Sequence, residues 1–80
     1  MSELLESAQR QAEAADYKKA LKTLERLEWQ SSRSDLSDAR GLLELAVAIK
    51  DKEPKLQKNC DWLIKQAGQN IDRLEKAPVH

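Results

Sequence analysis

The residues that most often carry out chemistry in proteins are few and scattered in this sequence. His80, the single histidine, is the last residue, and Cys60, the single cysteine, lies far from it. A zinc site needs three or four clustered ligands, and a cysteine nucleophile needs a base or a cationic setting beside it. Cys60 adjoins Asp61 but has no histidine nearby, so we expect a buried structural residue.

The larger catalytic motifs are also missing. The chain has no glycine-rich phosphate loop, no paired Ser, His and Asp residues, and no metal-ligand spacing. Its carboxylates are spread in the pattern of a solvated helix surface, many of them beside a lysine or arginine. We therefore predict no catalytic residue, no cofactor and no metal site, and we expect the protein not to be an enzyme.

The charged residues favour a protein partner over a nucleic acid. Fourteen basic and fourteen acidic residues give no net charge, whereas nucleic-acid-binding domains usually carry a clear basic excess. The best basic strip, with two glutamates interleaved, comprises Lys18, Lys19, Lys22 and Arg26. We interpret it as ordinary helix surface. A small regulatory nucleic-acid-binding protein remains the alternative hypothesis.

The two tryptophans are the candidate binding residues. On a helical wheel, Trp29 lies about 100° or more from the apolar stripe of its segment, and Trp62 lies about as far from its own. A tryptophan off the core stripe is either covered by another element or exposed as an interface anchor. Both interpretations stay open for each residue, and we propose both tryptophans as partner-binding candidates.

Four helical segments must position these residues, because the chain contains only two glycines and two prolines. We expect helices over about 2–15, 17–29, 36–50 and 54–76, with a turn at 15–16 and a polar loop over 30–34. Ser2 can cap the first helix, Ser34 or Asp35 can cap the third, and Pro54 suits a helix start. Gly68 interrupts the fourth helix, which predicts a close helix contact or a bend there.

The apolar patterns of these segments predict how they pack. Three of them carry one apolar stripe, whereas the segment 36–50 is apolar nearly all round and belongs in the middle of the fold. We predict an all-α, compact four-helix domain of two antiparallel helical hairpins with the third helix central. A single domain would cover residues 1–76, followed by a disordered tail at 77–80.

The first two segments resemble a tetratricopeptide-type helical hairpin. The resemblance covers about residues 4–30 and rests on Ala8 and on the run Ala15-Asp16-Tyr17-Lys18-Lys19-Ala20-Leu21, followed by Leu24 and Leu27. Ser7 and Gln11 depart from the family pattern, and residues 36–76 show no second repeat. The resemblance implies peptide or protein binding along the first helix, on a face that includes Gln9 and Glu13.

The remaining features concern location and partners. The start of the chain has no basic region followed by an apolar run, and the longest apolar stretch, Leu45–Ile49, is too short to span a bilayer. A lone cysteine allows no internal disulfide, so we expect a cytoplasmic protein without a membrane segment. The function that we predict is non-enzymatic binding of another protein, or assembly with itself as a homodimer or scaffold.

Overall fold

The computed structural model describes residues 3–76, without the side chains of residues 31 and 32. It contains four α-helices: α1 (Glu3–Glu13), α2 (Tyr17–Leu27), α3 (Leu36–Lys52) and α4 (Gln57–Lys76). A π-helical segment, η1 (Glu28–Ser32), follows α2, and a short 3₁₀ helix, η2 (Pro54–Leu56), precedes α4. Residues 3–76 contain no strand, so the predicted all-α fold of four helices is confirmed. The predicted Ser2 cap, the tail at 77–80 and His80 lie outside the described residues.

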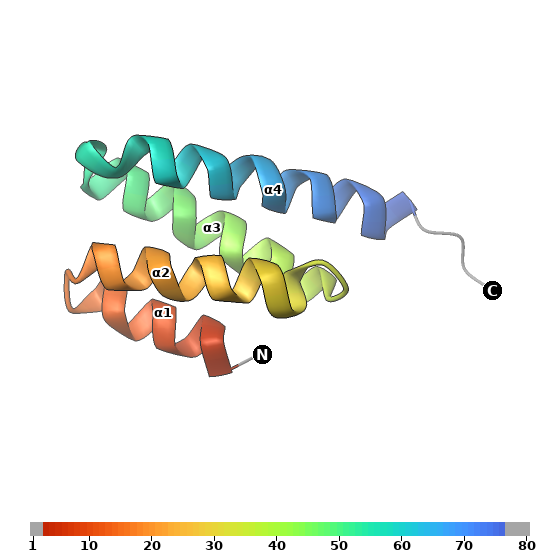
Figure 1. The fold of residues 1–80 in the computed structure, drawn as a ribbon, viewed down its shortest axis with the longest axis horizontal. Helices are drawn as coiled ribbons and strands as arrows, with labels where there is room; N and C mark the ends of the chain where they lie inside the picture. The colour runs from red at the N-terminus through yellow and green to blue at the C-terminus, as the bar shows by residue number, and fades with distance from the viewer. Residues whose placement is uncertain (1–2, 77–80) are drawn as a thin grey trace.

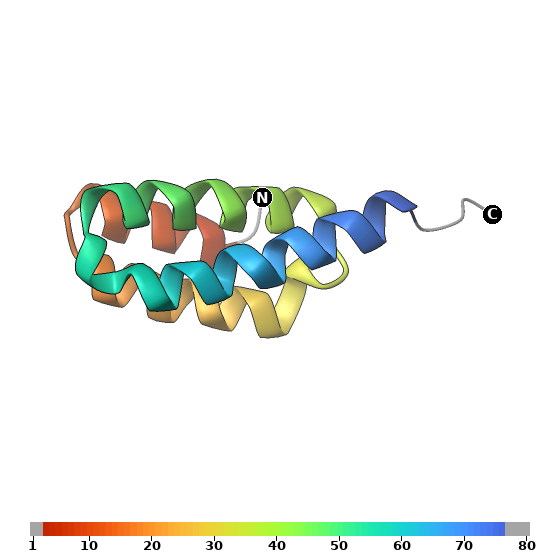
Figure 2. The same cartoon turned by 90° about the horizontal axis from the view of Figure 1, so that it is seen from above.

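The helices pair as two antiparallel hairpins, α1 with α2 and α3 with α4 (Figure 1). Seen from above, α1 and α3 lie toward one side of the molecule, and α2 and α4 toward the other (Figure 2). Helix α3 contacts all three other helices, which agrees with its predicted central position, and α2 shares that position because it does the same. No described helix has the length and apolar character needed to cross a membrane.

Most helix boundaries follow the expected local signals. Ala15 adopts a left-handed conformation with φ 62°, which reverses the chain between α1 and α2. Asp16 and Asp35 then cap α2 and α3, since each carboxylate accepts a hydrogen bond from the backbone N–H three residues on, at 3.4 Å and 3.2 Å. Pro54 begins η2, where its missing N–H removes no helical hydrogen bond.

The segment predicted as a polar loop over residues 30–34 is helical as far as residue 32, so the prediction is wrong for residues 30–32 and holds for the turn at 33–34. The chain continues from α2 into η1 as far as Ser32, and only a short turn separates η1 from α3. A π-helical turn is wider than an α-helical turn because its hydrogen bonds join residues five apart. The sequence Gln-Ser-Ser at 30–32 is typical of a loop, and nothing in these residue types indicates a π-helical turn.

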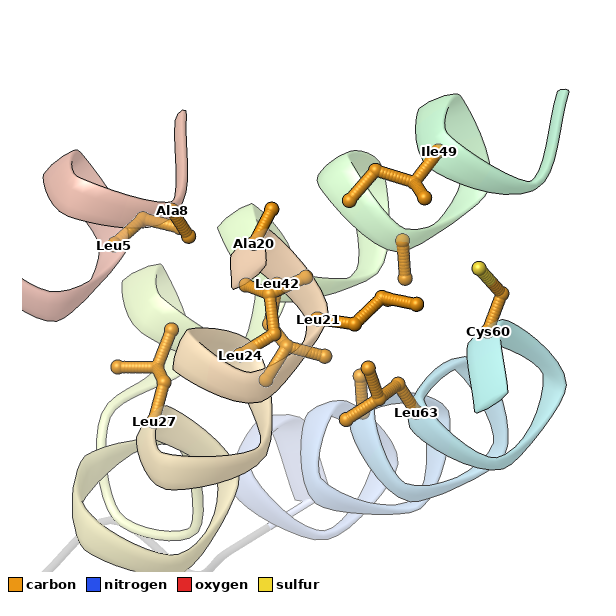
Figure 3. Close-up of a cluster of buried hydrophobic side chains, with 12 residues drawn as sticks. Leu5, Ala8, Ala20, Leu21, Leu24, Leu27, Leu42, Ile49, Cys60 and Leu63 are labelled. Carbon is orange, nitrogen blue, oxygen red and sulfur yellow. The ribbon is translucent and has the colours of Figure 1, made fainter. Parts of the chain in front are cut away.

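The core consists of aliphatic side chains from all four helices (Figure 3). Its largest fully buried apolar residues are Leu24, Leu27, Leu42, Ile49 and Leu63. Fully buried alanines on every helix, among them Ala8, Ala20 and Ala67, let the helix backbones come close together. None of the aromatic residues is among the buried ones, so burial of leucine, isoleucine and alanine supplies the hydrophobic stabilisation.

The neighbouring helices do not cover the whole apolar face of α3. Val47 is 49% exposed and Ala48 is also exposed, although both belong to the apolar run that predicted a helix enclosed on all sides. Contacts from three neighbouring helices still leave one flank of α3 open to solvent, and these two residues lie there.

The two glycines differ in their surroundings. A Cβ atom at Gly68 would meet nothing within 4 Å, and the residue is exposed within helix α4, so a close contact there is wrong, and the alternative of a bend stays a prediction. At Gly41 on α3, a Cβ atom would lie only 2.4 Å from Leu5 Cδ2. Gly41 therefore marks the close approach of α1 and α3, and Leu5 would have to move to admit any side chain there.

Candidate functional site

Trp29 and Trp62 lie against each other on the surface. Trp29 comes from η1 and Trp62 from α4, and their ring centroids are 6.3 Å apart with an interplanar angle of 34°. This separation is within the range of favourable aromatic pairs. Trp29 remains 61% exposed and Trp62 39% exposed, so the two rings cover each other only in part. The off-stripe positions in the sequence thus correspond to one exposed aromatic patch.

Arg33 completes this patch, and we call Trp29, Trp62 and Arg33 the tryptophan cluster. The guanidinium carbon of Arg33 lies 4.2 Å from the centroid of the Trp29 ring, which is a cation–π contact. Arg33 Nε also lies 3.7 Å from Oε1 of Glu28. These two contacts hold the arginine over the indole, so the surface of the cluster is partly cationic.

A buried polar network lies beneath the tryptophan cluster. Glu28 is 1% exposed and Asn70 is 5% exposed. The Asn70 amide Nδ2 donates to the Glu28 carboxylate, 2.8 Å from Oε1 and 3.0 Å from Oε2. Arg73 Nη2 donates to the backbone oxygen of Arg33 and, at 3.2 Å, to Asn70 Oδ1. Burying a carboxylate is expensive unless hydrogen bonds satisfy it, and this network supplies them.

The π-helical segment η1 positions Glu28 and Trp29, and Arg33 in the turn that follows it. Glu28 follows Leu24 by four residues, so it continues the buried stripe of α2, whereas Trp29 is rotated outward. Arg33 follows Glu28 by five residues, which is the spacing of hydrogen-bonded residues in a π-helix. This spacing places Arg33 next to Glu28 and Trp29. π-helical turns are rare in proteins and occur frequently at functional sites.

Four residues of the site, Glu28, Arg33, Asn70 and Arg73, were not predicted from the sequence. The signal was present for two of them: Glu28 continues the stripe of Leu24, and Asn70 follows Leu63 by seven residues on the stripe of α4. A polar residue on a core stripe requires a buried partner. Which partner it takes depends on the packing of η1 against α4, and the wheel of a single helix does not contain that information.

Gln9 and Glu13, the other predicted binding residues, lie elsewhere. They line a groove of ≈ 410 Å³ between α1 and α3, together with Ala12, Tyr17 and Lys52 among others. The groove shares no residue with the tryptophan cluster. The structure therefore brings the two tryptophans together but not the four predicted residues into one site.

Cys60 is fully buried in the core, as the sequence predicted. Desolvation by burial raises the pKa of its thiol, the neighbouring Asp61 carboxylate raises the pKa further, and Lys50 acts in the opposite direction. Lys50 Nζ lies 2.6 Å from Asp61 Oδ1, so these two charges pair with each other at the α3–α4 surface. A protonated, buried thiol is a poor nucleophile. Residues 3–76 hold no group of three or more side chains that could ligate a metal ion.

The residues that carry the tetratricopeptide resemblance form the α1–α2 hairpin. Ala8 and Ala20 are buried where α1 and α2 meet, and Ala15-Asp16 form the turn. Any close antiparallel pair of helices needs such small residues and such a turn, so the resemblance stays a prediction. No family model, curated protein or solved structure matches this chain.

Proposed function

We propose that the protein is a non-enzymatic helical module that binds another protein, or a second copy of itself, through the tryptophan cluster. The observation that carries this proposal is the exposed contact between Trp29 and Trp62, which come from distant parts of the chain. Tryptophan and arginine are the residues most enriched among those that dominate interface energetics. Large exposed apolar side chains gathered in one place often mark an interaction site.

The buried network supports the proposal because it fixes the tryptophan cluster before a partner arrives. Asn70 joins Glu28, the residue preceding Trp29, to α4, which carries Trp62. Arg73 joins the backbone of residue 33 to α4 as well. A surface that is already ordered loses less conformational entropy on binding, so more of the contact energy appears as affinity.

One observation favours the alternative, a small regulatory nucleic-acid-binding protein. The basic strip on α2 leads toward exposed tryptophans, and exposed aromatic residues beside cations can stack on single-stranded bases. Two facts favour a protein partner instead. The chain has no net charge, and Arg33 lies over the Trp29 ring where a stacked base would sit.

Affinity capture with matched variants tests the proposal. The wild-type protein and the Trp29→Ala, Trp62→Ala and Val47→Ala variants are immobilised, and the proteins they retain from the native host are quantified. Val47 is the control because it is an exposed apolar residue on α3, outside the tryptophan cluster. Sedimentation equilibrium on the same four proteins measures self-association.

The proposal predicts a retained protein, or a dimer, that is lost with either tryptophan variant and kept with Val47→Ala. Circular dichroism must show that the variants remain folded. A partner or dimer that survives both tryptophan substitutions would overturn the proposal.

A further inference from the structure

The cations around the tryptophan cluster are only partly matched by acidic partners. Among the described residues, Arg73 donates its hydrogen bonds to neutral oxygens, those of the Arg33 backbone and the Asn70 side chain, and takes part in no ion pair. Arg33 is half exposed and lies near Glu28 at the relatively long distance of 3.7 Å. The Arg33 guanidinium thus lies over the exposed Trp29 ring, and the Arg73 guanidinium donates to the Arg33 backbone without a carboxylate partner among the described residues.

The basic strip on α2 extends this positive charge. Lys18, Lys22 and Arg26 are exposed, follow one another at intervals of four residues, and form no ion pair within the described chain. Like charges four residues apart destabilise a helix, so the strip does not serve the folding of α2. Lys22 precedes Trp29 by seven residues, which places both on one flank of the helix.

A shallow groove runs beside this strip. Lys18 and Lys22 line a groove of ≈ 240 Å³ between α2 and the start of α4, with Leu56 and Asn59 on the opposite side. Glu25 is the one acidic residue that lines it. The groove therefore combines apolar residues with a cationic edge. It lies between α2 and α4, and the tryptophan cluster lies farther along the chain, between η1 and α4.

Elsewhere on α3 and α4, some cations are matched by carboxylates. The ion pairs of α3 and α4, among the described residues, are Arg40–Glu75, Lys50–Asp61 and Asp72–Lys76. Each contains one cation and one carboxylate. The cations Lys18, Lys22, Arg26 and Arg73 form no such pair within residues 3–76, and they lie on the flank that carries the tryptophans.

We propose that the occupant of this flank is an acidic peptide segment of a partner protein. This inference rests on the proposed function and names the chemistry of its partner. An aromatic or aliphatic side chain of the segment packs on Trp29 and Trp62, a neighbouring carboxylate pairs with Arg73, and further carboxylates lie along Lys22 and Lys18. Arginine pairs well with carboxylates because its planar fork can donate two parallel hydrogen bonds.

Selection from a random 12-residue peptide library displayed on phage tests the inference, because it requires no identified partner. The wild-type protein is the bait, and Arg73→Gln and Lys22→Gln are parallel baits. Arg40→Gln is the matched control, because Arg40 is an exposed arginine at the α3–α4 surface. Fluorescence anisotropy with the strongest-binding labelled peptide then gives the dissociation constant for each protein in low and high salt.

We expect the selected peptides to share Asp or Glu at a fixed distance from an aromatic or aliphatic residue. Arg73→Gln should weaken binding about tenfold or more, since a charge-assisted hydrogen bond contributes about 1.5–3 kcal/mol. Lys22→Gln should weaken it less and reduce its salt dependence, and Arg40→Gln should leave it unchanged. Lys22 is exposed on α2, so its variant keeps the test decisive if Arg73→Gln fails to fold.

Each other outcome has a distinct meaning. Neutral peptides whose binding requires Trp29 but not Arg73 or Lys22 would overturn the inference and keep the proposed function. An absence of peptides that depend on Trp29 or Trp62 would overturn both. Tighter binding of a labelled dT12 oligonucleotide than of any selected peptide, lost in Arg73→Gln, would overturn the inference in favour of a nucleic acid.

Discussion

Removing the two tryptophans singly and together should show how much they contribute to folding. Complete burial makes a Trp→Ala change cost about 3–5 kcal/mol. Trp29 is 61% exposed and Trp62 39% exposed, so the buried parts of the two rings are about 40% and 60%. Scaling by these fractions predicts that Trp29→Ala lowers the free energy of unfolding by about 1–2 kcal/mol and Trp62→Ala by about 2–3 kcal/mol.

The contact between the rings adds a term that only the double variant reveals. At a centroid distance of 6.3 Å, an aromatic pair contributes about 0.5–1.5 kcal/mol beyond its buried area. The Trp29→Ala/Trp62→Ala variant should therefore lose about 1 kcal/mol less than the sum of the two single losses. The reason is that the interaction between the rings is lost in each single variant, so the sum of the two single losses counts it twice. The double variant loses it only once.

Urea unfolding followed by circular dichroism at 222 nm measures all four free energies, because the helical backbone dominates this signal and it persists when the tryptophans are removed. Equal slopes for the four transitions would show that the variants unfold from comparable folded states. Strict additivity of the losses would contradict the ring contact. A loss above 3 kcal/mol for Trp29→Ala would show that Trp29 is a core residue, and the tryptophan cluster would then not be a binding surface.

Three further predictions concern the polar network, the glycines and the thiol. Asn70→Ala should lower the free energy of unfolding by about 1–3 kcal/mol because it removes the amide donor of the buried Glu28 carboxylate, and a neutral result in urea unfolding would contradict the network. Gly68→Ala should raise the free energy of unfolding by about 1 kcal/mol. Gly41→Ala should raise it less, or lower it, because the new methyl group would displace Leu5. Equal changes for the two variants would refute the close approach at Gly41. Since folding raises the pKa of Cys60, the native state keeps its thiol proton when the unfolded state loses it, so stability should fall as pH rises above about 8.5. Cys60→Ala should remove that part of the pH dependence and cost about 1–2 kcal/mol at neutral pH, and an unchanged pH profile would contradict the shift.

Local signals in the sequence account for much of the fold. Asp35 was suited to a helix cap, Pro54 to a helix start, and the stripes of leucine and alanine to burial. Each of these signals acts within a few neighbouring residues. The exact course of residues 28–32 was not predictable in the same way. Glu28, the first residue of the π-helical turn, pairs with Asn70 across the fold, and that contact depends on α4.

The candidate site was predictable only in part, for a related reason. The helical wheel identified Trp29 and Trp62 as unusual, because off-stripe positions depend on one helix at a time. Their mutual contact and the cation above them depend on how η1 packs against α4. Gly41 and Gly68 show the same limit: glycine lowers helix propensity wherever it stands, but only the approach of a second helix distinguishes a required glycine from an incidental one.

The most direct test of a protein-binding tryptophan cluster is a two-dimensional ¹⁵N NMR titration with the strongest-binding selected peptide. The chain has only two tryptophans, so the spectrum contains only two indole N–H signals, one for each ring. We predict that both indole signals shift as peptide is added, together with the backbone amides of η1 and the middle of α4. Amides along the α1–α3 groove should stay unchanged. Shifts confined to that groove, around Gln9 and Glu13, with both indole signals fixed, would contradict the account.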